Sequence, residues 1–95
     1  MARRRYILAY DIMDDKRLRR VHSCAKTYGY ALQYSVFICD LDSMELTHLK
    51  WDLGAMIAHG EDRVALIDLG EVTSPTRFEF LGVHPVLPRQ GPTII

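Results

Sequence analysis

A short apolar run near the amino terminus constrains the fold more than any other feature. Residues 5–11 read Arg-Tyr-Ile-Leu-Ala-Tyr-Asp, and a helical pattern begins within a few residues of the end of this run. So short a run, rich in Tyr, Ile and Leu, is typical of a central strand covered on both faces. Asp11 closes the strand at the edge of the core, a position that suits a metal ligand or a general base. A turn residue without a chemical role is the alternative interpretation of Asp11.

The next segment predicts an amphipathic helix over about residues 14–28. Its apolar residues recur at steps of three and four, which forms one stripe toward the core. The stripe consists of Leu18, Val21, Ala25 and Tyr28. Asp14 is expected to cap the start of the helix, because Asp is a favoured N-cap residue. Gly29 is expected to end it in a left-handed C-cap conformation.

A second strand-like stretch covers residues 30–41, which is long for a single strand. The polar residues Gln33 and Ser35 interrupt it, so we expect a kink or bulge that divides the stretch in two. Asp42 and Glu45 then have the spacing of a capping box and mark the start of a second amphipathic helix. The apolar stripe of that helix is Leu46, Leu49, Leu53, Met56 and Ile57.

Two further strands and an irregular tail complete the chain. Residues 63–69 predict a strand and residues 77–81 a shorter one, and the chain beyond them is rich in proline. The order strand, helix, divided strand, helix, strand predicts an α+β fold, a ferredoxin-like βαββαβ sandwich with an extra C-terminal strand. We expect a single domain over residues 1–82 and a C-terminal tail over residues 83–95.

Two helices that cross one face of such a sheet leave its other face uncovered. A chain of 95 residues buries a limited fraction of its surface, so a second copy is a natural source of additional burial. Face-to-face packing of two sheets about a two-fold axis is the simplest solution. We therefore expect a homodimer.

Composition and motifs exclude several classes of protein. The sequence has no apolar stretch long enough to span a membrane and no signal-peptide pattern, so the expected compartment is the cytoplasm. Cys24 and Cys39 lack the short spacing of a redox or zinc site and are expected to be reduced core residues. A phosphate-binding glycine loop, a serine nucleophile elbow and zinc-spaced histidines are also absent from the sequence.

The net charge of zero conceals an uneven distribution of charge. Residues 1–30 hold eight cations and three acids, a balance of +5, and residues 31–95 hold four cations and nine acids, a balance of −5. A basic third joined to an acidic remainder indicates a surface for a polyanion. A solvated helix face with a basic N-terminal end is the alternative.

The strand-end acid and the arginines beside it suggest phosphodiester chemistry. A lone carboxylate binds Mg²⁺ weakly, but two copies of Asp11 brought together by a two-fold axis would form a site. A metal held there would polarise a phosphoryl oxygen and generate hydroxide for attack on phosphorus. Arginines hold phosphate groups bidentately. The candidates for this contact are Arg17, Arg19 and Arg20.

Several short motifs together resemble one family. They are Tyr10-Asp11-Ile12, the run from Asp14 to Val21, Tyr28-Gly29, Gln33-Tyr34-Ser35-Val36-Phe37, and Glu61-Asp62-Arg63-Val64 ahead of a strand. At this spacing they resemble the small CRISPR-associated adaptation proteins of the Cas-two family. The resemblance covers about residues 5–70 and does not extend to the tail.

The resemblance implies a homodimer in which the C-terminal strand, here residues 77–81, adds to the partner's sheet. It implies a Mg²⁺-dependent endonuclease that acts on single-stranded RNA or double-stranded DNA. It also implies a role in spacer acquisition, in antiviral defence, as the central dimer that bridges two integrase dimers. By this likeness Asp11 is the catalytic and metal-binding carboxylate, and Arg17 and Arg20 contact the nucleic-acid backbone. The residues that would line the dimer cleft are Tyr10, Ser35 and Phe37.

One position departs from the family pattern. Ala31 stands two residues before Gln33, where family members often carry arginine. The loss of a cation beside the scissile phosphate weighs against hydrolysis more than against a scaffold, in which many phosphate contacts share the binding. A non-catalytic DNA-bridging scaffold for the adaptation integrase and a related ribonuclease toxin of the same fold are therefore the alternatives.

Overall fold

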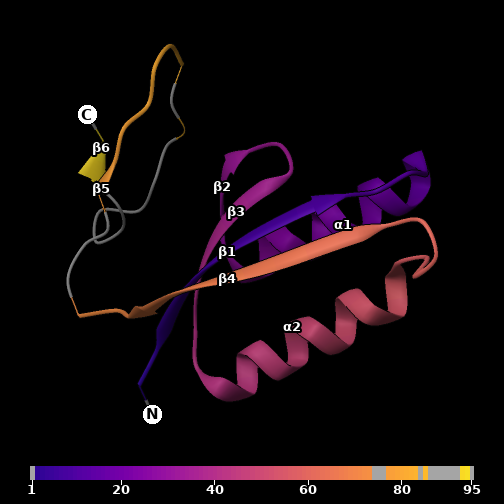
Figure 1. Ribbon diagram of the computed structural model, residues 1–95, viewed down its shortest axis with the longest axis horizontal. Helices are drawn as coiled ribbons and strands as arrows, with labels where there is room; N and C mark the ends of the chain where they lie inside the picture. Colours follow the sequence, from indigo (N-terminus) through magenta and orange to yellow (C-terminus); the bar gives the residue numbers. More distant parts are fainter. Residues whose placement is uncertain (1, 74–76, 84, 86–92, 95) are drawn as a thin grey trace.

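The computed structural model describes residues 2–73, 77–83, 85 and 93–94. Its elements follow the order βαββαβ and then two short strands (Figure 1). They are β1 (Arg4–Asp11), α1 (Asp15–Tyr28), β2 (Tyr30–Gln33), β3 (Val36–Leu41), α2 (Ser43–Met56), β4 (Arg63–Glu71), β5 (Arg77–Phe78) and β6 (Thr93–Ile94). None of the described helices is long and apolar enough to cross a membrane.

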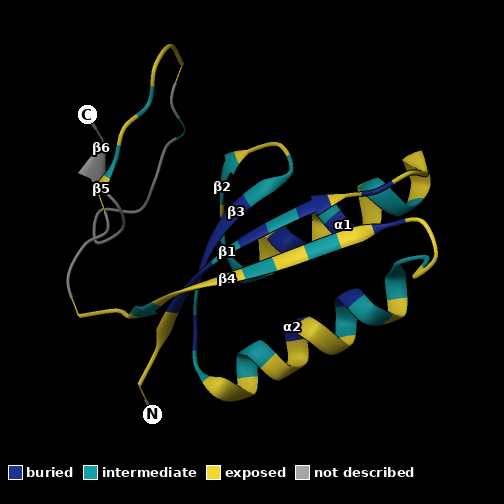
Figure 2. Ribbon diagram, viewed as in Figure 1, coloured by how far each residue is buried: buried dark blue, intermediate teal, exposed yellow. Residues whose placement is uncertain are grey.

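Strand β1 lies at the centre of a four-stranded antiparallel sheet with the order β2-β3-β1-β4. Leu8 illustrates the pairing, because its register partners are Phe37 on β3 and Leu66 on β4. Both helices cover one face of this sheet. There Leu8 and Phe37 are fully buried in one cluster with Val21 of α1 and Leu49 of α2 (Figure 2). The predicted ferredoxin-like α+β sandwich is confirmed.

Within the described part of the chain no helix covers the other face of the sheet, as expected for two helices that cross one face, so in a single chain β1 is covered on one face and not on both. Along β1, Ile7 and Ala9 are half-buried and Asp11 is exposed, whereas the alternating residues toward the helices are buried. Ile67 of β4 is 52% exposed. One apolar row crosses this open face through successive register pairs. It consists of Tyr30, Ile38, Ile7 and Ile67.

The strand-like stretch over residues 30–41 is divided in two as expected, into β2 and β3; the break is a hairpin turn at residues 34–35, and the register of β2 against β3 shifts between Ala31 and Gln33. The backbone N–H of Tyr10 donates a hydrogen bond to the carbonyl oxygen of Ser35 at 3.1 Å. This bond holds the tip of the hairpin beside the last residues of β1. The turn therefore lies at the same end of the sheet as Asp11.

The two helix starts are capped as the sequence predicts. The Asp14 carboxylate accepts a hydrogen bond from the backbone N–H of Arg17 at 3.0 Å, and this contact lowers the pKa of Asp14. At the start of α2, the Asp42 carboxylate accepts from the Glu45 N–H at 2.8 Å, and the Glu45 carboxylate accepts from the Asp42 N–H at 3.0 Å. Both predicted caps are confirmed.

Strand β5 is shorter than the predicted strand over residues 77–81, and it pairs in parallel with β6. Most of residues 83–95 lie outside the described part of the chain. The division into a domain ending at residue 82 and a tail therefore stays a prediction.

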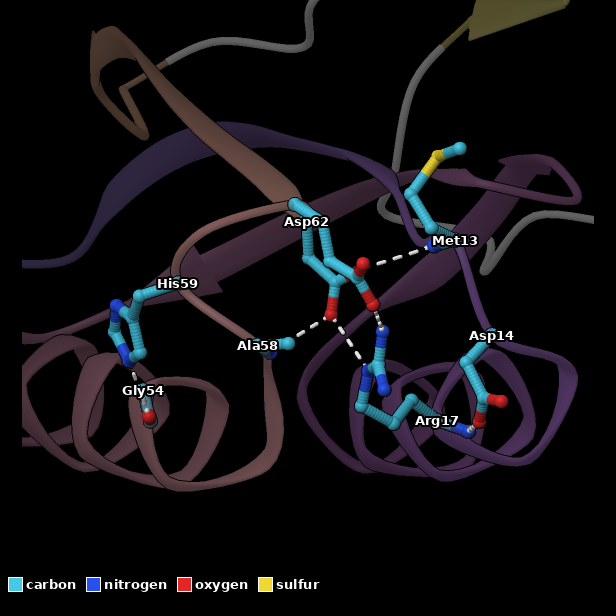
Figure 3. Close-up of polar contacts among 8 residues, drawn as sticks. Met13, Asp14, Arg17, Gly54, Ala58, His59 and Asp62 are labelled. Carbon is cyan, nitrogen blue, oxygen red and sulfur yellow. Dashed lines mark hydrogen bonds and ion pairs between the residues drawn. The ribbon is translucent and has the colours of Figure 1, made fainter.

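The Asp62 carboxylate joins the segment before β4 to the start of α1 (Figure 3). It accepts hydrogen bonds from the backbone N–H groups of Met13 at 2.9 Å and Ala58 at 2.8 Å, and from Nε of Arg17 at 2.8 Å. The Arg17 guanidinium also pairs with Glu61. The hydrogen bond from Arg17, together with the two backbone amides, holds the pKa of Asp62 well below its ordinary value and raises that of Arg17.

Gly29 is needed for a different reason than the expected left-handed cap. Its φ of −165° is extended backbone that any residue adopts. A Cβ at this position would overlap the carbonyl oxygen of Ile38 and lie 2.6 Å from Sγ of Cys39. Glycine therefore permits the close approach of the α1–β2 connection to β3.

We expect Gly29→Ala to lower the free energy of unfolding by about 1–3 kcal/mol, because an added methyl group would have to displace the β3 backbone. Urea denaturation measures this change. Gly54→Ala is the matched control, since nothing lies within 4 Å of its added Cβ. It should stabilise α2 by about 0.5–1 kcal/mol. A Gly29→Ala protein as stable as the wild type would contradict the steric explanation.

The pKa of Asp62 predicts a pH-dependent contribution to stability. The pKa of Asp62 in the folded protein lies below the ordinary 3.8. As the pH falls, the Asp62 carboxylate is therefore protonated in the unfolded chain at a higher pH than in the folded chain. The contribution is complete above about pH 5 and is lost as the pH falls below about 4. The stability difference between wild type and Asp62→Asn should therefore be larger at neutral pH than near pH 3, as measured by urea unfolding. An equal difference at both pH values would refute this prediction.

Candidate functional site

Asp11 is exposed at the carboxyl end of the central strand. Its register partner on β4 is Arg63, and the hairpin turn at Ser35 lies on the other side of β1. Among the described residues, no hydrogen bond or ion pair engages the Asp11 carboxylate. The strand ladder therefore fixes the backbone of Asp11 while its carboxylate oxygens stay available to a ligand.

Arg63 was not predicted from the sequence as a site residue. It is exposed, and its guanidinium has no ion-pair partner within the described part of the chain. Only the register of β1 against β4 places this cation next to Asp11, and that register cannot be read from the local sequence. Both residues line a shallow, open depression. Its lining residues are Ala9, Tyr10, Asp11, Ile57, His59, Asp62, Arg63, Val64 and Ala65.

Arg17, Arg19 and Arg20 do not join Asp11 in this depression. The guanidinium of Arg17 is engaged by Asp62 and Glu61, so its geometry serves the α1–β4 contact. Arg19 and Arg20 are exposed and line a separate groove with residues of α1 and α2. Phosphate contact by these three arginines stays a prediction, and the structure places it away from the Asp11 carboxylate.

The side chains of Tyr10 and Phe37 lie in the core beneath the sheet rather than in a cleft. Phe37 is fully buried and Tyr10 is 6% exposed, and their rings stack with centroids 6.3 Å apart. Strand alternation is the reason, because both side chains point toward the helices and that of Asp11 points to the open face. Ser35 is half-buried at the hairpin turn, beside the end of β1.

The Tyr10 hydroxyl is part of a small, partly buried hydrogen-bond network. It donates to the carbonyl oxygen of Tyr34 at 3.1 Å and lies 2.9 Å from Nδ1 of His22. Burial raises the pKa of Tyr10 to about 12, so its phenol stays protonated at neutral pH. Tyr10 therefore acts as a structural hydrogen-bond donor and is unsuited to act as a general base.

Within the described residues, Asp11 supplies one unpaired carboxylate to this depression. In the residues that the structure describes, no group of three or more His, Cys, Asp or Glu side chains lies close enough to hold a metal ion. Mg²⁺ keeps several waters and is commonly bound through one or two carboxylates. An exposed, unpaired Asp11 fits one half of such a site and does not fit a complete one.

Much of the basic N-terminal third is neutralised within the fold. Besides Arg17, three arginines form ion pairs with acids from the rest of the chain. The pairs are Arg3–Glu45 at 2.8 Å, Arg4–Asp68 at 3.0 Å and Arg5–Asp40 at 2.7 Å. Part of the charge asymmetry in the sequence is therefore explained by ion pairs within the chain, and the remaining cations are the candidates for a polyanion surface.

The free cysteines Cys24 and Cys39 are buried in the core, as expected. Burial raises the pKa of the Cys39 thiol to about 12 and also raises that of Cys24. Neither thiol is activated for nucleophilic chemistry.

Comparison with known proteins identifies the family. Residues 4–75 match the family described as CRISPR associated protein Cas2. The chain is 33% identical over 93 residues to the CRISPR-associated endonuclease Cas2 of Halalkalibacterium halodurans, covering 93% of this chain and 96% of that protein. It is 37% identical over 65 residues to the CRISPR-associated endoribonuclease Cas2 of Geobacter sulfurreducens, covering 68% of each.

Solved structures agree with the sequence relatives. The hypothetical protein TT1823 from Thermus thermophilus superposes with a TM-score of 0.76 at 33% identity, covering 88% of this chain and 96% of that chain. Streptococcus pyogenes Cas2 superposes with a TM-score of 0.65 at 30% identity, covering 70% of this chain and 86% of that chain. The match over most of the chain and the shared βαββαβ sheet confirm the resemblance in the sequence motifs, and this chain belongs to the Cas2 family of CRISPR-associated proteins.

Proposed function

We propose that this chain acts in CRISPR spacer acquisition, in defence against foreign nucleic acid, as a homodimeric Mg²⁺-dependent endonuclease. Its substrate would be single-stranded RNA or double-stranded DNA. The observation that carries the proposal is the exposed Asp11 carboxylate, which has no partner among the described residues and ends a central strand of the sheet. Relatives named endonuclease Cas2 and endoribonuclease Cas2 support it.

The residues around Asp11 suit the recognition of a phosphate group. Asp11 would supply one carboxylate ligand, and its backbone is held on the β4 side by the ladder and on the β3 side by the anchored hairpin. Arg63 presents a cation next to it, and its guanidinium would donate two parallel hydrogen bonds to two oxygens of a phosphate group. A bound Mg²⁺ would supply Lewis acidity toward the phosphoryl oxygen and the attacking water.

The open sheet face supports the homodimer. Its apolar row includes Tyr30 and Ile67, each 52% exposed, and would be buried by a second copy packed face to face. Strand alternation places Asp11 on this same face, together with Ile7 and Ala9. Dimerisation would therefore turn the Asp11 residues of two chains toward one interface, and each chain would contribute half of the metal site.

A second candidate function is a non-catalytic scaffold that holds duplex DNA for the adaptation integrase. Two observations favour it. The described part of one chain lacks a complete cluster of metal-binding residues, and Ala31 stands where the resemblance to the family implies an arginine. The exposed Arg19 and Arg20 would then contribute distributed phosphate contacts from the helical side.

We expect Asp11→Asn to reduce Mg²⁺-dependent cleavage of RNA or DNA on the order of 100-fold or more, because loss of even an indirect metal contact costs roughly 10- to 100-fold. Cleavage of labelled strands by purified protein, with Mg²⁺ or with EDTA, measures this effect. Asp15→Asn is the matched control, since Asp15 is an exposed acid in the first turn of α1. Cleavage at the wild-type rate by Asp11→Asn would refute the enzyme, and undetectable cleavage by the wild type would favour the scaffold.

We expect Ile67→Glu to convert the proposed dimer to a monomer, because it would place a carboxylate at the β4 end of the apolar row that the second copy would bury. Size-exclusion chromatography with light scattering measures the mass. Met44→Glu is the control, because Met44 is 62% exposed on α2, away from the sheet. The free energy of unfolding of a single Ile67→Glu chain should change by no more than about 0.5 kcal/mol, as for other exposed positions. A dimer that persists in Ile67→Glu would show that this face is not the interface.

A further inference from the structure

Tyr34 presents an exposed aromatic ring at the tip of the β2–β3 hairpin, where most tips carry small polar residues. The residue is 57% exposed, yet one face of its ring is occupied. The ring stacks on the imidazole of His22 with centroids 4.3 Å apart and an interplanar angle of 12°. The opposite face of the ring is therefore the one available to a ligand.

The imidazole beneath Tyr34 is itself fixed from several sides. Its Nδ1 lies 2.9 Å from the Tyr10 hydroxyl and 3.0 Å from the carbonyl oxygen of Tyr34. Its edge meets the buried ring of Phe37 at 5.5 Å and 70°. The exposed Tyr34 ring is therefore oriented by the His22 imidazole, which in turn contacts the core residues Tyr10 and Phe37. A preoriented ring loses little conformational entropy when a planar ligand stacks on it.

The position of this ring points to the kind of ligand. The bond from the Tyr10 N–H to the Ser35 carbonyl oxygen sets the hairpin tip beside the end of β1, and β1 ends at Asp11. On the β4 side of Asp11 stands Arg63, an exposed cation without an ion-pair partner among the described residues. The Tyr34 ring lies on the helical side of this end of the sheet, and Asp11 and Arg63 lie on its open side. An aromatic face and a cation are the two kinds of group with which proteins bind single-stranded nucleic acid, and a strand would pass around the sheet end between them.

We propose that Tyr34 is a stacking platform for one unpaired nucleobase of a strand whose phosphate group lies near Asp11 and Arg63. The proposal deepens the proposed function and rests on it, because it assigns single-stranded or locally unpaired nucleic acid as the substrate class of that site. Bases within a duplex stack on one another and do not offer a free face. Every base has a π face, so the platform selects unpaired bases without selecting their sequence.

The test measures equilibrium binding by fluorescence anisotropy in the Asp11→Asn background, where cleavage of the strand is expected to be strongly reduced. Tyr34→Ala should weaken binding of a labelled single strand by about 5- to 150-fold, the range for loss of one base–aromatic stack. Tyr34→Phe keeps the ring and should bind like the parent. Trp51→Ala removes an aromatic residue that is 79% exposed on α2 and should also bind like the parent.

Three further nucleic-acid probes separate the effect of base stacking from effects of misfolding and of charge. A duplex of the same sequence should bind equally well to the parent and to Tyr34→Ala, which shows that the variant is folded. A strand with abasic sites should bind the two proteins with equal affinity, because it has no base to stack. RNA and DNA strands, tested separately, decide which sugar the site accepts.

The proposal is overturned if the Tyr34→Ala protein binds the single strand as tightly as its parent. An equal loss toward single strand and duplex, or failure of the parent to bind single strands, also overturns it. Cleavage by the protein with Asp11 intact is assayed in parallel. Absence of cleavage contradicts the proposed nuclease, whereas the ratio of single-strand affinities decides the role of Tyr34.

Discussion

The pairing of β1 on both of its edges is the constraint from which the rest of the structure follows. Successive side chains of a strand point to opposite faces, so fixing the register against β3 and β4 decides which side chains enter the core. Leu8 is buried under the helices, and Asp11 three residues later is exposed on the open face. A shift of one residue would exchange these two sets, so the register specifies both the core and the site.

Electrostatic pairing between the two halves of the chain supports this register. Arg5 is 3% exposed and its guanidinium binds both oxygens of Asp40, its register partner on β3, at 2.7 Å each. This contact raises the pKa of Arg5. A bidentate pair has a narrow range of geometries, so it favours one alignment of β1 with β3 over its neighbours. Removal of Asp40 would take a charged partner from the poorly solvated Arg5 guanidinium, which is costly.

The local elements could be predicted from the sequence because short-range physics determines them. The caps at Asp14 and Asp42 depend on side chains within three residues, and the apolar stripes depend on helical spacing alone. For Gly29, local reasoning predicts the residue but not the physical reason for it. A glycine after a helix has two possible causes, a positive φ or a close neighbour, and only the position of β3 shows that the neighbour is the cause.

The site residues could be predicted only where the strand pattern itself places them. Asp11 ends a strand that the sequence pattern predicts, and it is exposed as expected. Arg17 looks like a free cation in the sequence, because its partners Asp62 and Glu61 come from a distant segment. Arg63 shows the opposite case. The sequence does not mark it as a site residue, and the register of β4 against β1 places it next to Asp11. Long-range pairing decides which charges remain free, and a single sequence does not contain that information.

Tyr10 and Asp11 are adjacent in sequence and serve opposite sides of the sheet. The Tyr10 hydroxyl reaches the His22 imidazole that supports the Tyr34 ring, while the Asp11 carboxylate stands on the face that a second copy would cover in the proposed dimer. One strand end thus orients the proposed base platform through the core and the proposed metal ligand through the open face. Because the same ladder holds both, a displacement of β1 at this end would move the base contact and the phosphate contact together.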